Sequence, residues 1–216
     1  MKNINPFYIY TDKNVLYIKN INGQTERLSN NIHSYCATID NSSNIHICAL
    51  DTRGRLNHFL KHNGSWKKKS ILKALNTTKN IKDMRLYSID DSLNVFIVEK
   101  YPLSNNLHKL SHFNFDVPNY RLSKYIIDNI LKDNGYFYKL EIDDFSNMVL
   151  EYKPSSSSDR TTSKLFFNSS SKQWSKSNIE NSIHTSRCSK ENKTTIKDDI
   201  FEYCYGIIYK IWKRAI

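Results

Sequence analysis

Two pairs of histidines are the residues of this sequence whose spacing first suggests chemistry. His58 and His62 are followed 50 residues later by His108 and His112, so both pairs have the same internal spacing. Neutral imidazoles are common zinc ligands, which makes a metal site one interpretation. In a strand, however, residues four apart lie about 13 Å from each other, so one pair cannot hold one ion. We therefore prefer inheritance of one position by two repeat units, and we expect no metal site.

Three Asp–Asn segments share the spacing of short acidic loops. Calcium loops need a central glycine and a distal bidentate glutamate, and these segments have neither. Aspartate and asparagine side chains also close tight turns, because they bond to nearby backbone amides. We expect three hairpin turns at Asp40–Asn44, Asp90–Asn94 and Asp143–Asn147.

The sequence contains no motif for nucleophilic catalysis or nucleotide binding. Neither G-x-S-x-G, G-x-x-x-x-G-K-[ST] nor G-x-G-x-x-G occurs. The acidic pairs, such as Asp143–Asp144, are adjacent, so their side chains diverge in a strand or turn. A glycosidase needs two carboxylates across a cleft, which a sequence does not reveal. We expect no catalytic residues and no cofactor, and a sialidase- or glycosidase-like enzyme is the weakest alternative.

Three aromatic residues at intervals of 54 are the next candidates, together with the basic residues beside them. Trp66 and Trp174 are 108 residues apart, and Tyr120 stands midway. An aromatic that recurs once per repeat either packs between units or stacks on a sugar, and packing is the commoner role. The basic neighbours occupy equivalent places, so they would form one charged rim. The candidate ligand-binding residues are Trp66, Lys67, Lys68, Tyr120, Arg121, Trp174 and Lys176.

The overall charge agrees with an anionic partner. The 216-residue chain has 32 Lys and Arg against 21 Asp and Glu, a net charge of +11. Such a balance favours nucleic acid, anionic glycan or a membrane surface, although a basic surface also simply keeps a protein soluble. The positive charge is spread along the chain and forms no specific nucleic-acid motif.

These residues belong to an internal repeat of short strands. The aspartates of the three Asp–Asn segments are 50 and 53 residues apart, and Ile, Val, Tyr and Phe alternate on either side. Such alternation around turn residues predicts antiparallel strands. Each repeat holds about four strands, which corresponds to one blade of a β-propeller. We predict an all-β fold, a small β-propeller of about five four-stranded blades, with a repeat of about 50–54 residues.

The repeat divides the chain into five units of one propeller domain, residues 1–216. A helix over 120–132 is the alternative to a strand there, because Leu122, Ile126 and Ile130 are four residues apart. We expect a hairpin loop at 154–163 and a linker at 182–195. The expected units are 6–30, 31–80, 81–125, 126–180 and 181–216.

Signals for location and redox state are few. No apolar run is long enough to span a membrane and no signal-peptide core follows Met1, so we expect a cytoplasmic protein. Association with a membrane surface stays open, because the tail 207–216 mixes aromatic and basic residues; a strand that closes the ring is our preferred interpretation. Cys36 and Cys48 would face each other on adjacent strands, and a disulfide there is not required.

One unit resembles a known family. Asp51–Gly54 forms a D-x-x-G turn, and a strand and a short polar turn separate it from Trp66. This order resembles the blades of tachylectin-like and fungal fucose-lectin propellers and, more loosely, those of sialidase-type propellers. The resemblance implies a propeller that binds glycans in pockets between blades. The sequence departs from the fucose lectins because no set of Arg, Glu and Trp recurs in every unit, and it lacks the sialidase S-x-D-x-G-x-x-W box.

Fold pattern and charge together favour recognition over chemistry. We predict a non-enzymatic binding module with lectin-like recognition of glycans or anionic polymers. A scaffold that binds a protein partner is the second alternative. Repeated pockets between blades would favour the first function, and one continuous exposed apolar patch would favour the second.

Overall fold

The computed structural model describes residues 7–20, 22–104, 106–117, 119–133, 135–156 and 161–176. These residues form strands β1 to β15 and contain no helix, which confirms the all-β prediction. Within this part of the chain, accordingly, there is no helix of the length and apolarity that crossing a membrane requires. The expected unit 181–216, with its linker and tail, lies outside the described residues.

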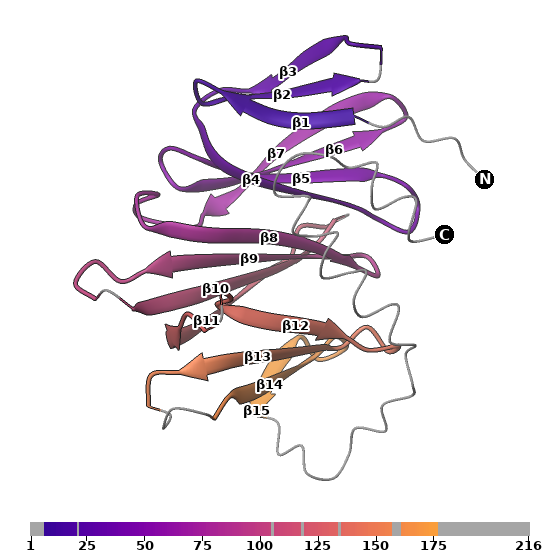
Figure 1. Cartoon of the computed structure of the whole chain (residues 1–216). Coiled ribbons are helices and arrows are strands. Elements are labelled where there is room, and N and C mark those ends of the chain that lie inside the picture. The colour runs from indigo at the N-terminus through magenta and orange to yellow at the C-terminus, as the bar shows by residue number, and fades with distance from the viewer. Residues whose placement is uncertain are drawn as a thin grey trace.

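The strands form four antiparallel meanders, which we call units 1 to 4 (Figure 1). Units 3 and 4 join into one eight-stranded sheet through a short pairing of Ile130 with Pro154 and Leu131 with Lys153. The strands are β1 (Phe7–Asp12), β2 (Val15–Asn20) and β3 (Thr25–Ser29) in unit 1; β4 (Ile32–Ile39), β5 (Ile45–Asp51), β6 (Arg55–His62) and β7 (Ser65–Lys73) in unit 2; β8 (Ile81–Ile89), β9 (Ser92–Lys100), β10 (Leu107–Asp116) and β11 (Leu122–Leu131) in unit 3; and β12 (Tyr138–Ile142), β13 (Met148–Pro154), β14 (Ser163–Asn168) and β15 (Gln173–Lys176) in unit 4.

The D-x-x-G turn has the local chemistry that its sequence indicates. The Asp51 carboxylate accepts hydrogen bonds from the backbone amides of Arg53 and Arg55, each at 2.9 Å. Gly54 has φ = 77°, and a Cβ there would lie 2.2 Å from the Leu75 carbonyl oxygen. Glycine is therefore required both for the turn and for the close approach of the next connection.

The core consists of three apolar layers, each between two consecutive units. Phe59 of unit 2 packs against Ile9, Leu16 and Ile18 of unit 1. The second layer joins unit 2 to unit 3, and the third joins unit 3 to unit 4. Phe113 and Phe167 occupy the place of Phe59 in those layers, at intervals of 54 residues. A single unit cannot bury its own apolar face, so stacking of units makes the core.

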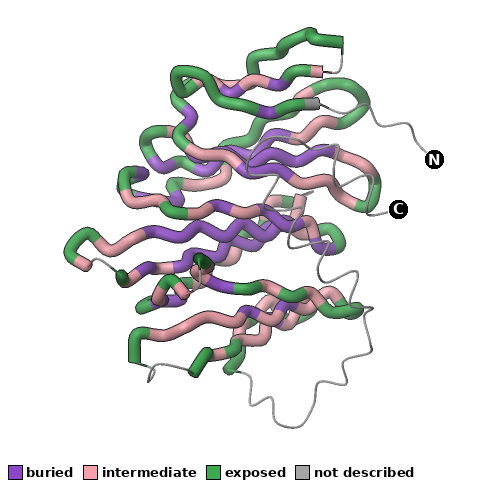
Figure 2. Tube along the Cα trace, in the orientation of Figure 1, coloured by how far each residue is buried: buried purple, intermediate pink, exposed green. Residues whose placement is uncertain are grey.

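Burial shows which units are internal and which are terminal. Strands β5 and β9 of units 2 and 3 are buried on both faces, as Figure 2 shows in purple. Unit 4 is buried only toward unit 3. Its other face carries Glu151, which lies 4.0 Å from Lys139 and 3.5 Å from Lys164, nitrogen to oxygen. A polar outer face is typical of the end of a repeat array.

Several expectations change in the structure. Residues 122–131 form strand β11, so the helical alternative for 120–132 is wrong; Leu110, Ser111 and His112 of β10 pair with its residues. The same strand runs across the expected unit boundary at 125/126. Within the described residues the four units form no closed ring, and units 1 and 4 lie at opposite ends in Figure 1.

Two of the three expected Asp–Asn turns form. The Asp40 carboxylate accepts a hydrogen bond from the backbone amide of Asn44 at 2.7 Å, and Asp143 holds Asn147 in the same way at 2.8 Å. The second segment differs, because the chain turns tightly before Ser92 and Asn94 lies inside β9, where it is buried. The expectation was wrong for this segment.

The cysteine pair has the predicted register. Cys36 on β4 pairs with Cys48 on β5, and both side chains are buried. No disulfide joins them. Burial raises the pKa of the Cys48 thiol, which keeps that thiol protonated and unreactive.

Candidate functional site

The recurring aromatics lie at the interfaces between units. Trp66 packs into the layer between units 1 and 2. Tyr120 of unit 3 and Trp174 of unit 4 each contact a buried histidine of the preceding unit. All three are partly buried, so packing between units is a role that each of them fills.

Tyr120 ends a chain of hydrogen bonds that we call the His58 relay. The Tyr120 hydroxyl lies 3.0 Å from His58 Nδ1, and His58 Nε2 lies 3.0 Å from His46 Nδ1. His46 Nε2 lies 3.1 Å from the Asp40 carboxylate. Because a carboxylate only accepts, one consistent direction runs from the hydroxyl through both imidazoles to Asp40. Both rings are then neutral, and each bonds to its neighbour rather than leaving a nitrogen for a metal ion.

Burial agrees with neutral rings. It lowers the pKa of His58 to about 3 and lowers the pKa of His46, where Asp40 opposes the shift. Burial raises the pKa of Asp40, but hydrogen bonds from Asn44 and His46 outweigh it, and the net direction is downward. At neutral pH the relay therefore holds one carboxylate and two uncharged imidazoles.

An equivalent chain, the His112 relay, joins units 3 and 4. Trp174 Nε1 donates to His112 Nδ1 at 3.0 Å, and His112 Nε2 donates to the Asn94 side-chain oxygen at 3.0 Å. An indole nitrogen is only a donor, which fixes the tautomer of His112. Burial lowers the pKa of His112 to about 3. The histidines thus fasten consecutive units together.

The basic candidates do not gather at one place. Lys68 on β7 faces unit 1, where its Nζ lies 2.9 Å from the Ser29 hydroxyl. Lys69 points to the opposite face, and its Nζ lies 3.9 Å from the centre of the Tyr120 ring. Lys67 shares that opposite face by strand alternation. Arg121 and Lys176 are exposed in units 3 and 4.

Two pockets do repeat between units, and Lys68 lines one of them. Pocket 1–2 lies where unit 1 meets unit 2 and has a volume of about 340 Å³. Pocket 2–3 lies where unit 2 meets unit 3 and has a volume of about 330 Å³. The charged side chains are Asp51, Arg53, Arg55 and Lys68 in pocket 1–2, and Lys73, Glu99, Lys100, Lys109 and Lys124 in pocket 2–3.

The two pockets are built from equivalent positions. Lys68 pairs across its hairpin with Phe59, and Lys124 pairs with Phe113. Each ammonium lies over the ring of its partner, at 5.5 Å for Lys68 and 5.4 Å for Lys124. Arg55 and Lys109 each stand four residues before these phenylalanines. The same cationic frame therefore occurs twice in successive units.

The electrostatics of both pockets favour an anion. Pocket 1–2 has three cationic side chains and one carboxylate, a net charge of +2, and pocket 2–3 has four and one, a net charge of +3. Glu99 is engaged by Lys109 at 2.9 Å, and Asp51 by its own turn. The remaining cations face a polar, open concavity, which attracts a sulfate, phosphate or carboxylate group.

Sequence reasoning missed Arg55, Lys109 and Lys124. The interval of 54 residues places Leu122 opposite Lys68, whereas the hairpin that leads into β11 is longer and places Lys124 there. The spacing of Phe59, Phe113 and Phe167 would have given the right register for β6, β10 and β14.

Comparisons with known proteins add little. No protein-family model and no curated protein matches the sequence. Among solved structures, the chain is similar to one in a complex of S. cerevisiae Dbp5 bound to Nup159, Gle1, IP6 and ADP, with 14% sequence identity and a TM-score of 0.40. The match covers 78% of this chain and 50% of the other, so this chain spans half of that protein. At this TM-score the likeness supports no inference about fold or function.

Proposed function

We propose that the protein is a non-enzymatic binding module for anionic polymers, with acidic glycans as the preferred class, and that it binds them in pockets 1–2 and 2–3. The observation that carries the proposal is the repetition of one cationic frame, Arg55 with Lys68 and Lys109 with Lys124. A polymer presents its charges at regular intervals, so a repeated site can engage two of them at once. Two linked weak sites bind far more tightly than one.

We further propose that the four units are consecutive blades of a β-propeller. Three observations support this arrangement: each unit is an antiparallel meander, apolar layers join neighbours face to face, and the first strands of units 2 and 3 lie against each other. A crystal structure of the full chain tests it. Blades around a common axis would support the proposal, and a flat stack would contradict it.

The binding proposal is tested with a glycan array that includes sulfated and phosphorylated polymers, read at low and at physiological salt. We expect binding to acidic glycans that weakens with salt but persists at physiological ionic strength. Loss of all binding at physiological salt would mean that the +11 charge acts without a specific site. Exclusive binding of neutral sugars would also contradict the proposal.

Variants identify the pockets. We expect the double substitution Lys68→Ser and Lys124→Ser to weaken binding about tenfold or more, because one cation is lost from each pocket. The matched control is Lys67→Ser, which removes an exposed lysine next to Lys68 on the opposite face of β7. Equal losses in the control and the double variant would show that net charge, and not the pockets, determines binding.

A further inference from the structure

A third cavity lies on the inner side of the array and differs in kind from pockets 1–2 and 2–3. It has a volume of about 480 Å³, and residues of all four units line it, including Thr11 of β1 and the segment before β12. We call it the inner pocket. Among its lining residues are His33, Ile81, Lys82, Arg85, Lys132 and Phe137.

The inner pocket contains an ion pair that the packing of the units does not require. Arg85 Nε lies 2.8 Å from the Asp83 carboxylate, and the side chains are only 12% and 16% exposed. The equivalent positions hold His33 and Tyr35 in unit 2, so that unit packs without such a pair. Burying two charges costs free energy, and one unit bears this cost alone.

The guanidinium of Arg85 is held rigidly. It lies over the Tyr138 ring of unit 4, 5.2 Å from the ring centre, and also bonds to Tyr87. A planar, fixed guanidinium is suited to recognise a carboxylate or phosphate group. Positioned by two units, it does not have to lose side-chain entropy when a ligand binds.

Two further cations stand at the same cavity. Lys82 is exposed, and Lys132 Nζ lies 5.5 Å from the centre of the Phe137 ring. Within the part of the chain that the structure describes, neither lysine forms an ion pair. With Asp83 balancing Arg85, the inner pocket keeps a net charge of +2. Ile81, Met84 and Phe137 add apolar surface, which pockets 1–2 and 2–3 largely lack in this combination.

We propose that the inner pocket binds a small ligand that joins a carboxylate or phosphate group to an apolar or aromatic body. The anion lies between Lys82, Lys132 and Arg85, and the body packs against Phe137 and Met84. Small-molecule sites combine an apolar lining with a few fixed polar groups in this way. This site is independent of the polymer-binding pockets.

The test is a titration of the full-length protein with phenyl phosphate, followed by amide resonances in NMR spectra. Benzoate, inorganic phosphate and phenol are the comparison probes. We expect saturable shifts around Lys82–Arg85 and Phe137 with phenyl phosphate or benzoate, and weaker binding of phosphate or phenol alone. The first two probes distinguish a phosphate from a carboxylate preference. Absence of saturable shifts, or shifts confined to pockets 1–2 and 2–3, would overturn the proposal.

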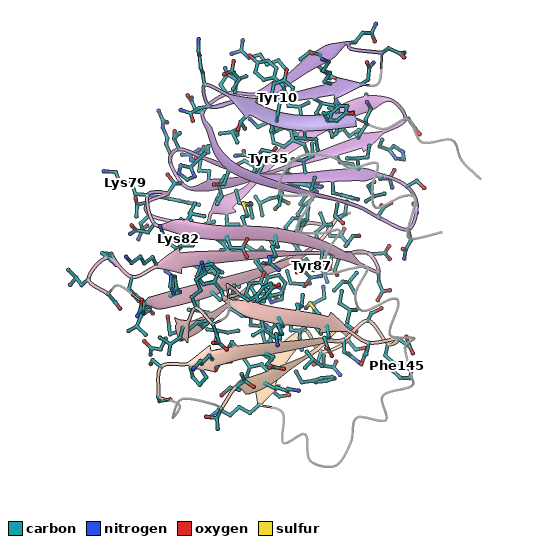
Figure 3. All side chains as sticks on the ribbon, in the orientation of Figure 1. Tyr10, Tyr35, Lys79, Lys82, Tyr87 and Phe145 are labelled. Carbon is teal, nitrogen blue, oxygen red and sulfur yellow. The ribbon has the colours of Figure 1, made fainter. Side chains whose placement is uncertain are left out.

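A matched pair of lysines makes the test specific. Lys82 lines the inner pocket, whereas Lys79, three residues earlier and also exposed, does not (Figure 3). We expect Lys82→Glu to raise the Kd for the tighter aromatic anion about tenfold and Lys79→Glu to leave it within about twofold. Both positions are at the surface, so folding is retained in either variant. An equal effect of the two substitutions would overturn the assignment.

Discussion

The His58 relay and the His112 relay use the same device in two different settings. In each, an aromatic donor of one unit bonds to Nδ1 of a buried histidine in the preceding unit, and donor and histidine are 62 residues apart. The acceptors differ. His112 donates to the neutral Asn94, whereas the chain from His58 continues through His46 to the Asp40 carboxylate.

The difference arises at one position of the repeat. His46 in unit 2 corresponds to Phe96 in unit 3, 50 residues later, and Phe96 stacks on His112 with ring centres 4.3 Å apart. The His112 relay is therefore enclosed by apolar rings. The His58 relay reaches a partly exposed carboxylate through a second imidazole. The first is a static fastening between units, and the second is a fastening that protons can reach.

The largest expected effect comes from breaking the enclosed relay. His112→Phe leaves the Trp174 nitrogen and the buried Asn94 oxygen without their histidine partner, which we expect to lower the free energy of unfolding by about 3 kcal/mol. His58→Phe leaves the Tyr120 hydroxyl, which is partly exposed and can bond to water, so we expect a loss of about 1–2 kcal/mol. Urea unfolding of both variants measures this. A larger loss for His58→Phe would refute the contrast.

The second test uses pH. The pKa values of His46, His58 and His112 are lowered in the folded state, so the unfolded chain binds more protons. Stability is then fully present above the ordinary histidine pKa of about 6.5 and falls as pH decreases toward about 3. Asp40 also has a lowered pKa and adds a loss only at the acidic end of that range.

The relays should respond to acid in order. On acidification, His46 can take a proton while it keeps Asp40 as a partner, and it then no longer accepts from His58. We expect the imidazole nitrogen resonances of His46 to change before those of His112 as pH falls from 7. In Asp40→Asn the carboxylate is lost, so His46 should titrate at lower pH, closer to His112. An unchanged His46 titration in that variant would show that Asp40 does not tune the relay.

These contrasts show what the sequence could and could not predict. Alternating apolar residues around Asp51–Gly54 and the Asp40 and Asp143 turns were enough to predict strands and hairpins, because those signals are local. The Asp90 segment misled, since buried bonds from His112 and Asn114 draw Asn94 into a strand. The binding frame was missed for a related reason, because the length of the hairpin before β11 sets the register of Lys124.

The smallest expected effect concerns a contact that only the His58 relay has. Lys69 Nζ lies over the Tyr120 ring at 3.9 Å, and a cation over an aromatic face at an exposed site contributes about 0.5–1 kcal/mol. Lys69→Met keeps the length of the side chain and removes its charge, so we expect urea unfolding to show a loss of that size. The control is Lys67→Met on the same face of β7, for which no such contact is found among the described residues and no loss is expected. Because the ammonium also disfavours protonation near the tyrosine, Lys69→Met should leave the acid response of His46 unchanged or shift it slightly upward. A downward shift would mean that Lys69 supports the relay by some route other than its contact with Tyr120.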